Sequence, residues 1–150
     1  MIAMRRLLAL LVPLLLIASG AWAAGCDAPA PTVHPAASDT ATAMARSFAG
    51  TWQGQWAVAV KDHAAPICAR LYILVLGPTN ATVEQCTGSN KDAHRRAECK
   101  QFAAEIDGNE MSFSDLQGTI YKLTMADVGG MKAEATSAEH RSVTVFVKPE

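Results

Sequence analysis

The sequence predicts an all-β fold, an antiparallel eight-stranded up-and-down barrel preceded by a short helix. Three observations support this prediction. Apolar and polar residues alternate in segments from Phe48 onward, turn-forming residues separate the segments at near-regular spacing, and no segment between them has a helical period. Such alternation is typical of half-buried strands. Eight antiparallel strands can close on themselves, which removes both sheet edges. A two-sheet β-sandwich is the alternative that the same pattern allows.

The first segment, residues 1–23, has the pattern of a signal peptide. Arg5 and Arg6 precede the apolar run Leu7–Ala18, and Ala21-Trp22-Ala23 provides a small-x-small site for cleavage before Ala24. The run is shorter than the roughly 20 apolar residues that a membrane-spanning helix needs. We therefore expect an exported protein, periplasmic or secreted.

The charge of the mature chain excludes some classes of function. Cleavage after residue 23 would leave 11 basic and 14 acidic residues, a formal net charge of −3. Nucleic-acid binding needs a basic footprint, which this balance does not provide. The chain also has no Gly-x-Ser-x-Gly elbow and no glycine-rich phosphate loop. We expect a protein that is not an enzyme and uses no cofactor.

The four cysteines fit an oxidising compartment, where an even number predicts two disulfides. Cys86 ends one predicted strand and Cys99 begins the next, which favours a Cys86–Cys99 bridge. Cys26–Cys68 then follows by exclusion. The alternative for Cys26 is a lipid anchor, because it follows Ala24-Gly25, the small residues of a lipoprotein cleavage site.

A zinc site is a second alternative for the cysteines. His63-x4-Cys68 and His94-x4-Cys99 would together supply two histidines and two cysteines. The spacing departs from that of known zinc motifs, and oxidised cysteines cannot bind zinc. We therefore predict no metal.

The mature chain divides into a Pro/Ala-rich lead, residues 24–43, and a single barrel domain, residues 44–150. The lead has no apolar period, which predicts a flexible or polyproline-II-like segment. Ser38-Asp39-Thr40 predicts the cap of a short helix through Ala41 to Phe48. That helix would run directly into the first strand.

The first strand is the most strongly patterned. Both tryptophans of the mature chain, Trp52 and Trp56, lie on one face of it together with Gly54, Val58 and Val60. Residues 67–76 and 81–86 predict a hairpin, and residues 87–100 a polar loop. Later strands place alternate residues inward. These are Phe102, Ala104, Ile106, Met111, Phe113, Thr119, Tyr121, Leu123, Met125, Met131, Ala133, Ala135, Ser137, Val143, Val145 and Val147.

The motif Gly50-Thr51-Trp52, at the start of the first strand of a β-meander and after a short helix, resembles the calycins, the lipocalin-like barrels. Residues 106–113 and 118–123 are similar to the hairpins of small secreted bacterial barrels of that type. The resemblance covers residues 44–148. It implies that Trp52 plugs the closed end of the barrel, and that a cation from near the last strand, Arg141 or Lys148, stacks over its ring.

The resemblance and the inward pattern together suggest a function. We expect a small apolar or amphipathic ligand at the open end, opposite Trp52, in a monomeric protein with no membrane span. Core packing remains the alternative role for the candidate ligand wall, which comprises Trp56, Phe113, Tyr121, Met125 and Ala135. The second functional hypothesis is a protein-binding module, such as a periplasmic hydrolase inhibitor or accessory subunit. Unfilled volume beside Trp56 and Tyr121 would favour the ligand. A filled barrel with a protruding 87–100 loop would favour the protein partner.

Overall fold

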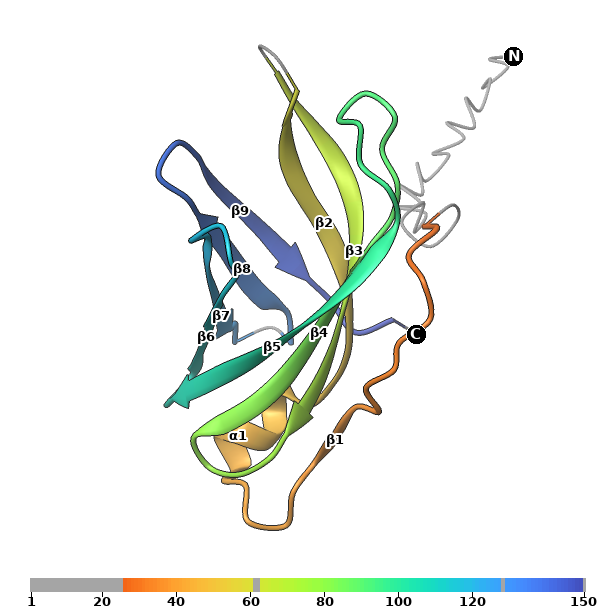
Figure 1. Ribbon diagram of the computed structural model, residues 1–150. Helices are drawn as coiled ribbons and strands as arrows, with labels where there is room; N and C mark the ends of the chain where they lie inside the picture. The colour runs from red at the N-terminus through yellow and green to blue at the C-terminus, as the bar shows by residue number, and fades with distance from the viewer. Residues whose placement is uncertain (1–25, 61–62, 128, 150) are drawn as a thin grey trace, which may run out of the picture.

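The computed structural model describes residues 26–60, 63–127 and 129–149. The predicted signal peptide, residues 1–23, lies outside these residues. One short helix and nine strands make up the described chain, and Figure 1 shows them as one strongly curled sheet. In chain order these are β1 Ala36–Ala37, α1 Ala43–Phe48, β2 Gly50–Val60, β3 His63–Val75, β4 Asn80–Thr87, β5 Glu98–Asp107, β6 Glu110–Ser114, β7 Ile120–Met125, β8 Met131–Thr136 and β9 Arg141–Phe146.

Strands β2 to β9 form an up-and-down meander in which each strand pairs antiparallel with the next. The first and last of them meet at Gln53 and Val147, whose backbones exchange hydrogen bonds of 2.8 and 2.9 Å. This contact closes the sheet into an eight-stranded barrel. The predicted barrel is therefore confirmed, and the sandwich alternative is wrong because one continuous sheet contains all the strands.

Helix α1 and Trp52 close one end of the barrel. Thr42 caps the helix by accepting a hydrogen bond from the Ala45 N–H at 3.1 Å, which places the helix start two residues later than the sequence suggested. Phe48 is fully buried, and its carbonyl accepts the indole N–H of Trp52 at 2.8 Å. The buried indole is thereby satisfied, as buried Trp side chains usually are.

Lys148 is the cation over Trp52. Its Nζ lies 5.0 Å from the centre of the ring, within the range of a cation–π contact. Arg141, the other candidate, does not reach this end, because it begins β9 whereas Lys148 follows the strand's last residue. Instead, the Nη2 of Arg141 lies 2.6 Å from Glu134 Oε1 on β8.

The predicted register of β9 is wrong. Val143, Val145 and Val147 face solvent, with 53%, 59% and 52% exposed. Phe146 is fully buried, and its ring passes over Gly54 on β2. Alternating β-branched residues favour a strand but do not fix which face is buried. Phe146 is the larger apolar side chain, and the space above Gly54 accepts it.

Both predicted disulfides are confirmed, Cys86–Cys99 and Cys26–Cys68. Cys86 and Cys99 are direct partners across β4 and β5, with their Cα atoms 4.0 Å apart. Cys26 is bonded to Cys68 on β3, so its sulfur is not free for the lipid anchor that was the alternative. A Cβ atom on Gly88 would lie 2.5 Å from the Cys68 sulfur and nearer still to the Asp27 carboxylate, so any larger residue there would force these neighbours to move.

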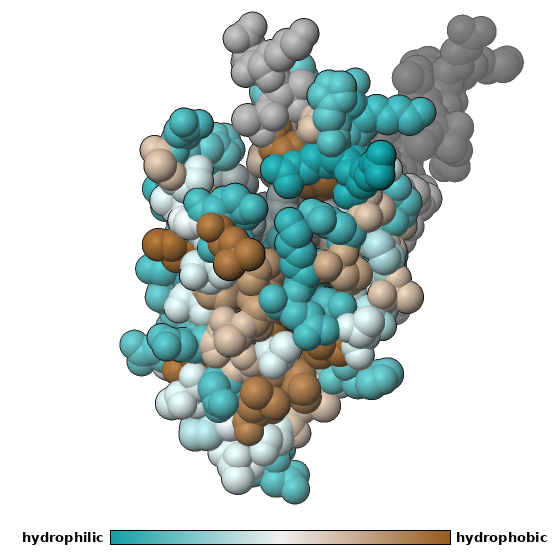
Figure 2. Space-filling model, viewed as in Figure 1, coloured by the Kyte–Doolittle hydropathy of each residue, from teal (hydrophilic) through white to brown (hydrophobic). Residues whose placement is uncertain are grey.

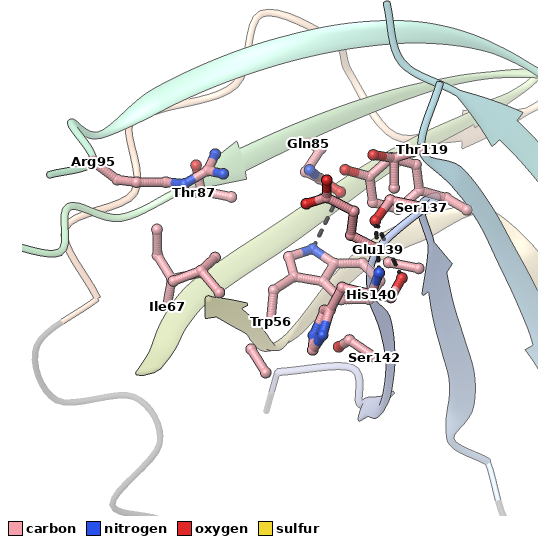
Figure 3. Close-up of a pocket in the computed structure, with 14 residues that line it drawn as sticks. Trp56, Ile67, Gln85, Thr87, Arg95, Thr119, Ser137, Glu139, His140 and Ser142 are labelled. Carbon is pink, nitrogen blue, oxygen red and sulfur yellow. Dashed lines mark hydrogen bonds between the residues drawn. The ribbon is translucent and has the colours of Figure 1, made fainter. Parts of the chain in front are cut away.

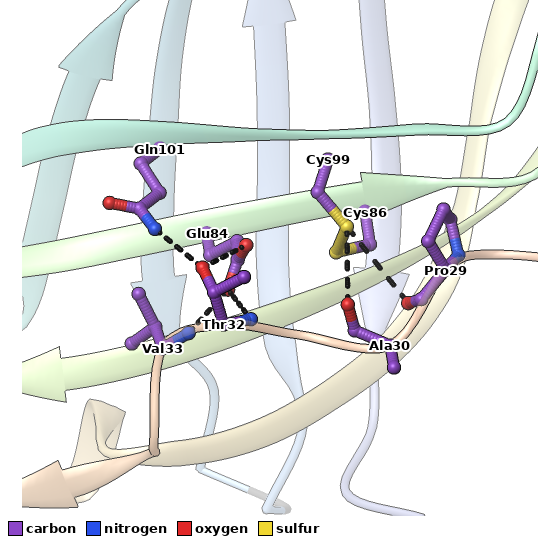
Figure 4. Close-up of a disulfide and its surroundings, with 8 residues drawn as sticks. All are labelled: Pro29, Ala30, Thr32, Val33, Glu84, Cys86, Cys99 and Gln101. Carbon is purple, nitrogen blue, oxygen red and sulfur yellow. Dashed lines mark hydrogen bonds between the residues drawn. A yellow bond between two sulfur atoms is a disulfide. The ribbon is translucent and has the colours of Figure 1, made fainter.

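Over its described residues the lead lies extended against the barrel. From Cys26 onward it crosses the outer face of β3, β4 and β5 (Figures 1 and 4), and β1 pairs in parallel with β3 at Leu74 and Val75. Its sequence has no apolar period because it packs through backbone groups and short side chains. Composition alone therefore gave no signal for this packing.

The contact that holds the lead is a buried carboxylate on β4. Glu84 is only 2% exposed and accepts the backbone N–H groups of Thr32 and Val33 at 2.8 and 2.7 Å. The Thr32 hydroxyl donates to the same carboxylate at 2.9 Å, and Gln101 donates to that hydroxyl at 2.7 Å (Figure 4). Burial raises the pKa of Glu84, but the Val33 and Thr32 hydrogen bonds outweigh it, and the net pKa is lowered.

Within the described part of the chain, the one helix is too short to cross a bilayer.

Candidate functional site

A cavity of about 280 Å³ opens at the end of the barrel opposite Trp52. The strands that run toward this end are joined by residues 88–97, 115–119 and 137–140, so their connections surround the mouth. Figure 3 shows side chains from both sides of the barrel converging on it. The lining residues are Trp56, Ala57, Val58, Ile67, Gln85, Thr87, Arg95, Thr119, Tyr121, Ala135, Ser137, Glu139, His140 and Ser142.

An aromatic stack forms one wall and extends beneath the cavity. Trp56 and Tyr121 meet edge to face with ring centres 5.5 Å apart. Tyr121 stacks on Phe113 at 4.8 Å, and Phe113 stacks on Phe102 at 5.0 Å. Aromatic pairs in such geometries gain stability beyond their buried area. The wall is therefore preformed rather than assembled around a ligand.

The indole N–H of Trp56 is already satisfied within the barrel. It donates to the amide oxygen of Gln85 at 3.2 Å, and Figure 3 shows Gln85 reaching toward the indole from β4. The Gln85 side chain also hydrogen-bonds with the Tyr121 hydroxyl, so it links the two aromatic groups at the edge of the cavity.

The hydroxyl of Tyr121 is the second polar group inside the mouth. It lies 3.4 Å from a carboxylate oxygen of Asp115. Burial raises the pKa of Tyr121, and the negative charge of Asp115 raises it further. The phenol therefore stays neutral throughout the physiological pH range and can donate a hydrogen bond there.

The rim is more polar than the sequence indicated. Arg95 projects from the loop after β4, and Figure 3 shows its side chain extending across the mouth near Thr87. On the opposite side, Ser137 and His140 form a tight turn in which the Ser137 N–H donates to the His140 carbonyl at 2.8 Å. That turn holds Glu139 and His140 at the mouth.

Three of the five candidate ligand residues line this cavity: Trp56, Tyr121 and Ala135. Phe113 lies behind Tyr121, 5% exposed, and supports the wall without lining the cavity. Met125 lies nearer the closed end, partly buried against the core. Both side chains face into the barrel, as predicted. Their positions along the strands place them nearer the closed end than the cavity. Whether any of the five binds a ligand stays a prediction.

Sequence reasoning missed Gln85, Arg95, His140 and Ser142. Gln85 shares the inward parity of Val83, so the pattern of β4 could have found it. Ser142 was missed because β9 was assigned the opposite face. Arg95 and His140 lie in connections, where no periodicity places a side chain.

Among the described residues, one group could supply metal ligands, and its members are already engaged. The ligand atoms of Glu84, Cys86 and Cys99 lie within 4.8 Å of one another. The two sulfurs are bonded to each other, however, and Glu84 accepts hydrogen bonds from the lead. In the His-x4-Cys pattern, Cys68 and Cys99 belong to different disulfides.

The fold and the cavity define a class: a small, disulfide-bonded, eight-stranded antiparallel β-barrel with an aromatic-walled cavity at its open end. No family model matches the chain, and no curated protein matches its sequence. Among solved structures, the chain is similar to a de novo designed fluorescence-activating β-barrel, with a TM-score of 0.51 and 14% identity. The likeness covers 72% of this chain and 99% of the designed one, and it supports the barrel fold alone.

Proposed function

We propose that this protein is an exported, non-catalytic, lipocalin-like barrel that binds a small apolar or amphipathic ligand in the cavity at its open end. The observation that carries the proposal is the unfilled volume of about 280 Å³ beside Trp56 and Tyr121. This is the feature that distinguishes a ligand-binding barrel from a solid one. A protein-binding module remains the second candidate.

The size and lining of the cavity limit the ligand. Drug-sized ligands occupy pockets of roughly 300–1,000 Å³, so a volume of about 280 Å³ suits a molecule of one or two rings, or a short chain. The edge of Trp56 and the face of Tyr121 favour a flat apolar part. The Gln85 amide, the Tyr121 hydroxyl and Arg95 could orient a polar group at the mouth.

Export rests on two separate features. The two disulfides indicate an oxidising, extracytoplasmic environment. The signal-peptide pattern of residues 1–23 supports export through a secretion pathway. We therefore place the protein in the periplasm or outside the cell.

The test uses 6-propionyl-2-(dimethylamino)naphthalene, an uncharged probe with two fused rings whose emission rises and shifts to shorter wavelength in apolar surroundings. We expect saturable binding to the mature protein, competition by fatty acids, quinones or small aromatic compounds, and loss of binding in Ala135→Trp. Ala135 lines the cavity, so the new indole should fill it. Thr136→Trp is the matched control, because the exposed neighbouring side chain places the same indole outside the barrel.

Binding that survives Ala135→Trp, or is lost equally in both variants, would contradict the proposed site. A correctly folded protein that shows no probe binding and no thermal shift with any compound would mean that the cavity takes no ligand. The protein-binding hypothesis would then be preferred.

A further inference from the structure

Strand β5 is paired on one side only for most of its length. It runs from Glu98 to Asp107, but β6 pairs with only its last three residues, 105–107. On the other side, β4 pairs with β5 from Glu98 to Glu105. No other strand of the described chain pairs with residues 98–104. The wall of the barrel is therefore interrupted between β5 and β6, as Figure 1 shows.

The register of β4 and β5 shows which backbone groups of β5 have no strand to bond with at this interruption. In antiparallel sheets, the Cα atoms of a directly opposite pair are closer when the two residues exchange no hydrogen bonds. The Cα atoms of Cys86 and Cys99 are only 4.0 Å apart, so this pair exchanges none. The Ile106 N–H, in contrast, donates to Thr79 at 2.8 Å in the same register. Even-numbered residues of β5 therefore bond to β4. The N–H and C=O groups of Cys99, Gln101 and Ala103 point the other way, toward the interruption.

A turn after β6 explains why that strand does not cover the edge. The carboxylate of Asp115 accepts the backbone N–H groups of Gln117 and Thr119, each at 2.9 Å. The Asp115 N–H donates to the Thr119 carbonyl at 3.1 Å. In the register of β5 and β6, Ser114 would lie opposite Ala103, but these bonds turn the chain away into β7, and the pairing does not continue past Glu105 and Ser112.

A groove of about 710 Å³ runs beside the unpaired edge. It is lined by Lys100, Gln101, Phe102, Ala103, Ser114, Asp115, Leu116 and Gln117. Leu116 is fully exposed on one side of it, and Phe102 is half-buried on the other. A second hollow of about 300 Å³ shares Phe102 with this groove, and shares Tyr121 and Arg95 with the mouth cavity. In the space-filling view, apolar residues form small groups among polar ones on this face of the barrel (Figure 2).

Natural proteins prevent strand pairing at such edges with proline, a bulge or charged side chains, especially lysine. This edge carries such charges only toward one end, at Glu98 and Lys100. The stretch from Gln101 to Ala103 has no proline and no charge. Lys100, next to it, is paired with Glu98 at 3.0 Å. An uncharged extended segment would therefore meet no unpaired charge of β5 along this stretch.

We propose that the free edge of β5, from Cys99 to Ala103, binds an extended, uncharged segment of a partner protein by strand addition. Alternating N–H and C=O groups match another polypeptide backbone, which supplies the complementary donors and acceptors. The segment would be about five residues long, since strands advance by ~3.3 Å per residue. Its alternate side chains would enter the groove between Phe102 and Leu116. The second hollow joins this groove to the mouth cavity, but the proposed contacts are backbone groups of β5, which do not line that cavity, so the proposal does not depend on the small ligand.

The first measurement is amide hydrogen exchange on the free protein. We expect fast exchange at Cys99, Gln101 and Ala103, and slow exchange at Lys100, Phe102 and Ala104, which bond to β4. Uniformly slow exchange in the monomer would overturn the proposal, because the edge would already be paired. Protection that rises with protein concentration would overturn it too, since a second copy of the chain would then be the occupant.

The second measurement adds the acetylated, amidated probe peptide Thr-Val-Thr-Leu-Thr-Val-Thr. We expect it to slow exchange at Cys99, Gln101 and Ala103 by at least tenfold, and we expect its form with N-methylated valines and leucine to have no effect. Ala103→Pro removes one outward N–H and should weaken peptide binding about tenfold. Ala103→Thr keeps that N–H and is the control. Peptide binding that leaves these three amides unchanged, or that N-methylation does not weaken, would exclude strand addition.

Discussion

At the scale of single residues, Gly54 determines how the last strand packs. A Cβ atom at this position would lie 2.9 Å from the ring of Phe146, closer than real Cβ atoms approach a neighbour. The ring is held on its other side by Trp56, whose centre is 5.3 Å away. Phe146 therefore occupies the volume that a side chain on β2 would take, and β9 buries Phe146 rather than its valines.

We predict that Gly54→Ala destabilises the protein by about 1–3 kcal/mol, the usual range for overpacking a core. Urea unfolding followed by Trp fluorescence measures the change. Phe146→Leu, costly alone, should cost less in the Gly54→Ala background, because residues in contact are coupled. If the two changes are additive, the contact between them is not the cause.

Trp52 is the second residue with a large expected effect. It is fully buried, its N–H is bonded to Phe48, and Lys148 lies over its ring. Trp52→Ala should cost about 3–5 kcal/mol, as large-to-small changes in cores usually do. Lys148→Met removes only the charge and should cost about 0.5–1 kcal/mol. Chemical denaturation measures both. A Lys148→Met cost that matched Arg141→Met would show no special role for the cation over Trp52.

At the scale of elements, the lead behaves as an outer layer fixed at three points. The Cys26–Cys68 disulfide holds one end, Glu84 the middle, and β1 the other end. Asp27 adds a local contact, accepting the N–H and the hydroxyl of Ser89, and these bonds lower its pKa. The lead also buries Glu84 on the outer face of the barrel, a position where solvent exposure would otherwise be expected.

We predict that the lead detaches under acid. The pKa of Glu84 is lowered in the folded state, so its contribution to stability is present above the ordinary carboxyl pKa and is lost as the pH falls through the folded value. The protection of the Thr32 and Val33 amides, measured against the intrinsic exchange rate at each pH, should therefore decrease as the pH falls below the ordinary carboxyl pKa. Glu84→Gln should exchange faster already at pH 7, with a weaker dependence on pH. An unchanged acid response in Glu84→Gln would assign the effect to other carboxylates.

At the scale of the whole molecule, the two disulfides constrain different parts of the fold. Cys86–Cys99 closes a short loop within the sheet, with a sequence separation of 13. Cys26–Cys68 joins the lead to the barrel over a separation of 42. In the chain-entropy description both reduce the freedom of the unfolded chain, the longer loop somewhat more.

We predict that replacing Cys86 and Cys99 by serine costs about 3 kcal/mol, and that replacing Cys26 and Cys68 costs about 4 kcal/mol, on loop-entropy grounds. Denaturant unfolding of each pair measures the costs. Only the second pair should also accelerate hydrogen exchange in the lead, because only that bridge attaches it. Equal exchange in the lead of both variants would show that Glu84 and β1 hold it without the disulfide.

Much of the barrel could be read from the sequence, because period-two burial is a local property. The alternation of Trp52, Gly54 and Trp56 placed β2 correctly, and the same reasoning found the inward residues of β5, β6, β7 and β8. The positions of Cys86 and Cys99 at strand ends gave one disulfide, and Cys26–Cys68 followed by exclusion. The candidate site was found in part. Trp56, Tyr121 and Ala135 line the cavity because parity places them inside and near the open end.

Only the tertiary structure decided the features that depend on contacts between distant segments. The valines of β9 have an ideal strand pattern, yet Phe146 is buried because Gly54 on β2 leaves room for it. The lead has no apolar period, yet it is ordered because Glu84 on β4 accepts its backbone N–H groups. Arg95 and His140 reach the mouth from loops, where no repeat fixes direction. Local sequence specifies which residues can alternate, whereas the partner across the barrel specifies which of the two faces is buried.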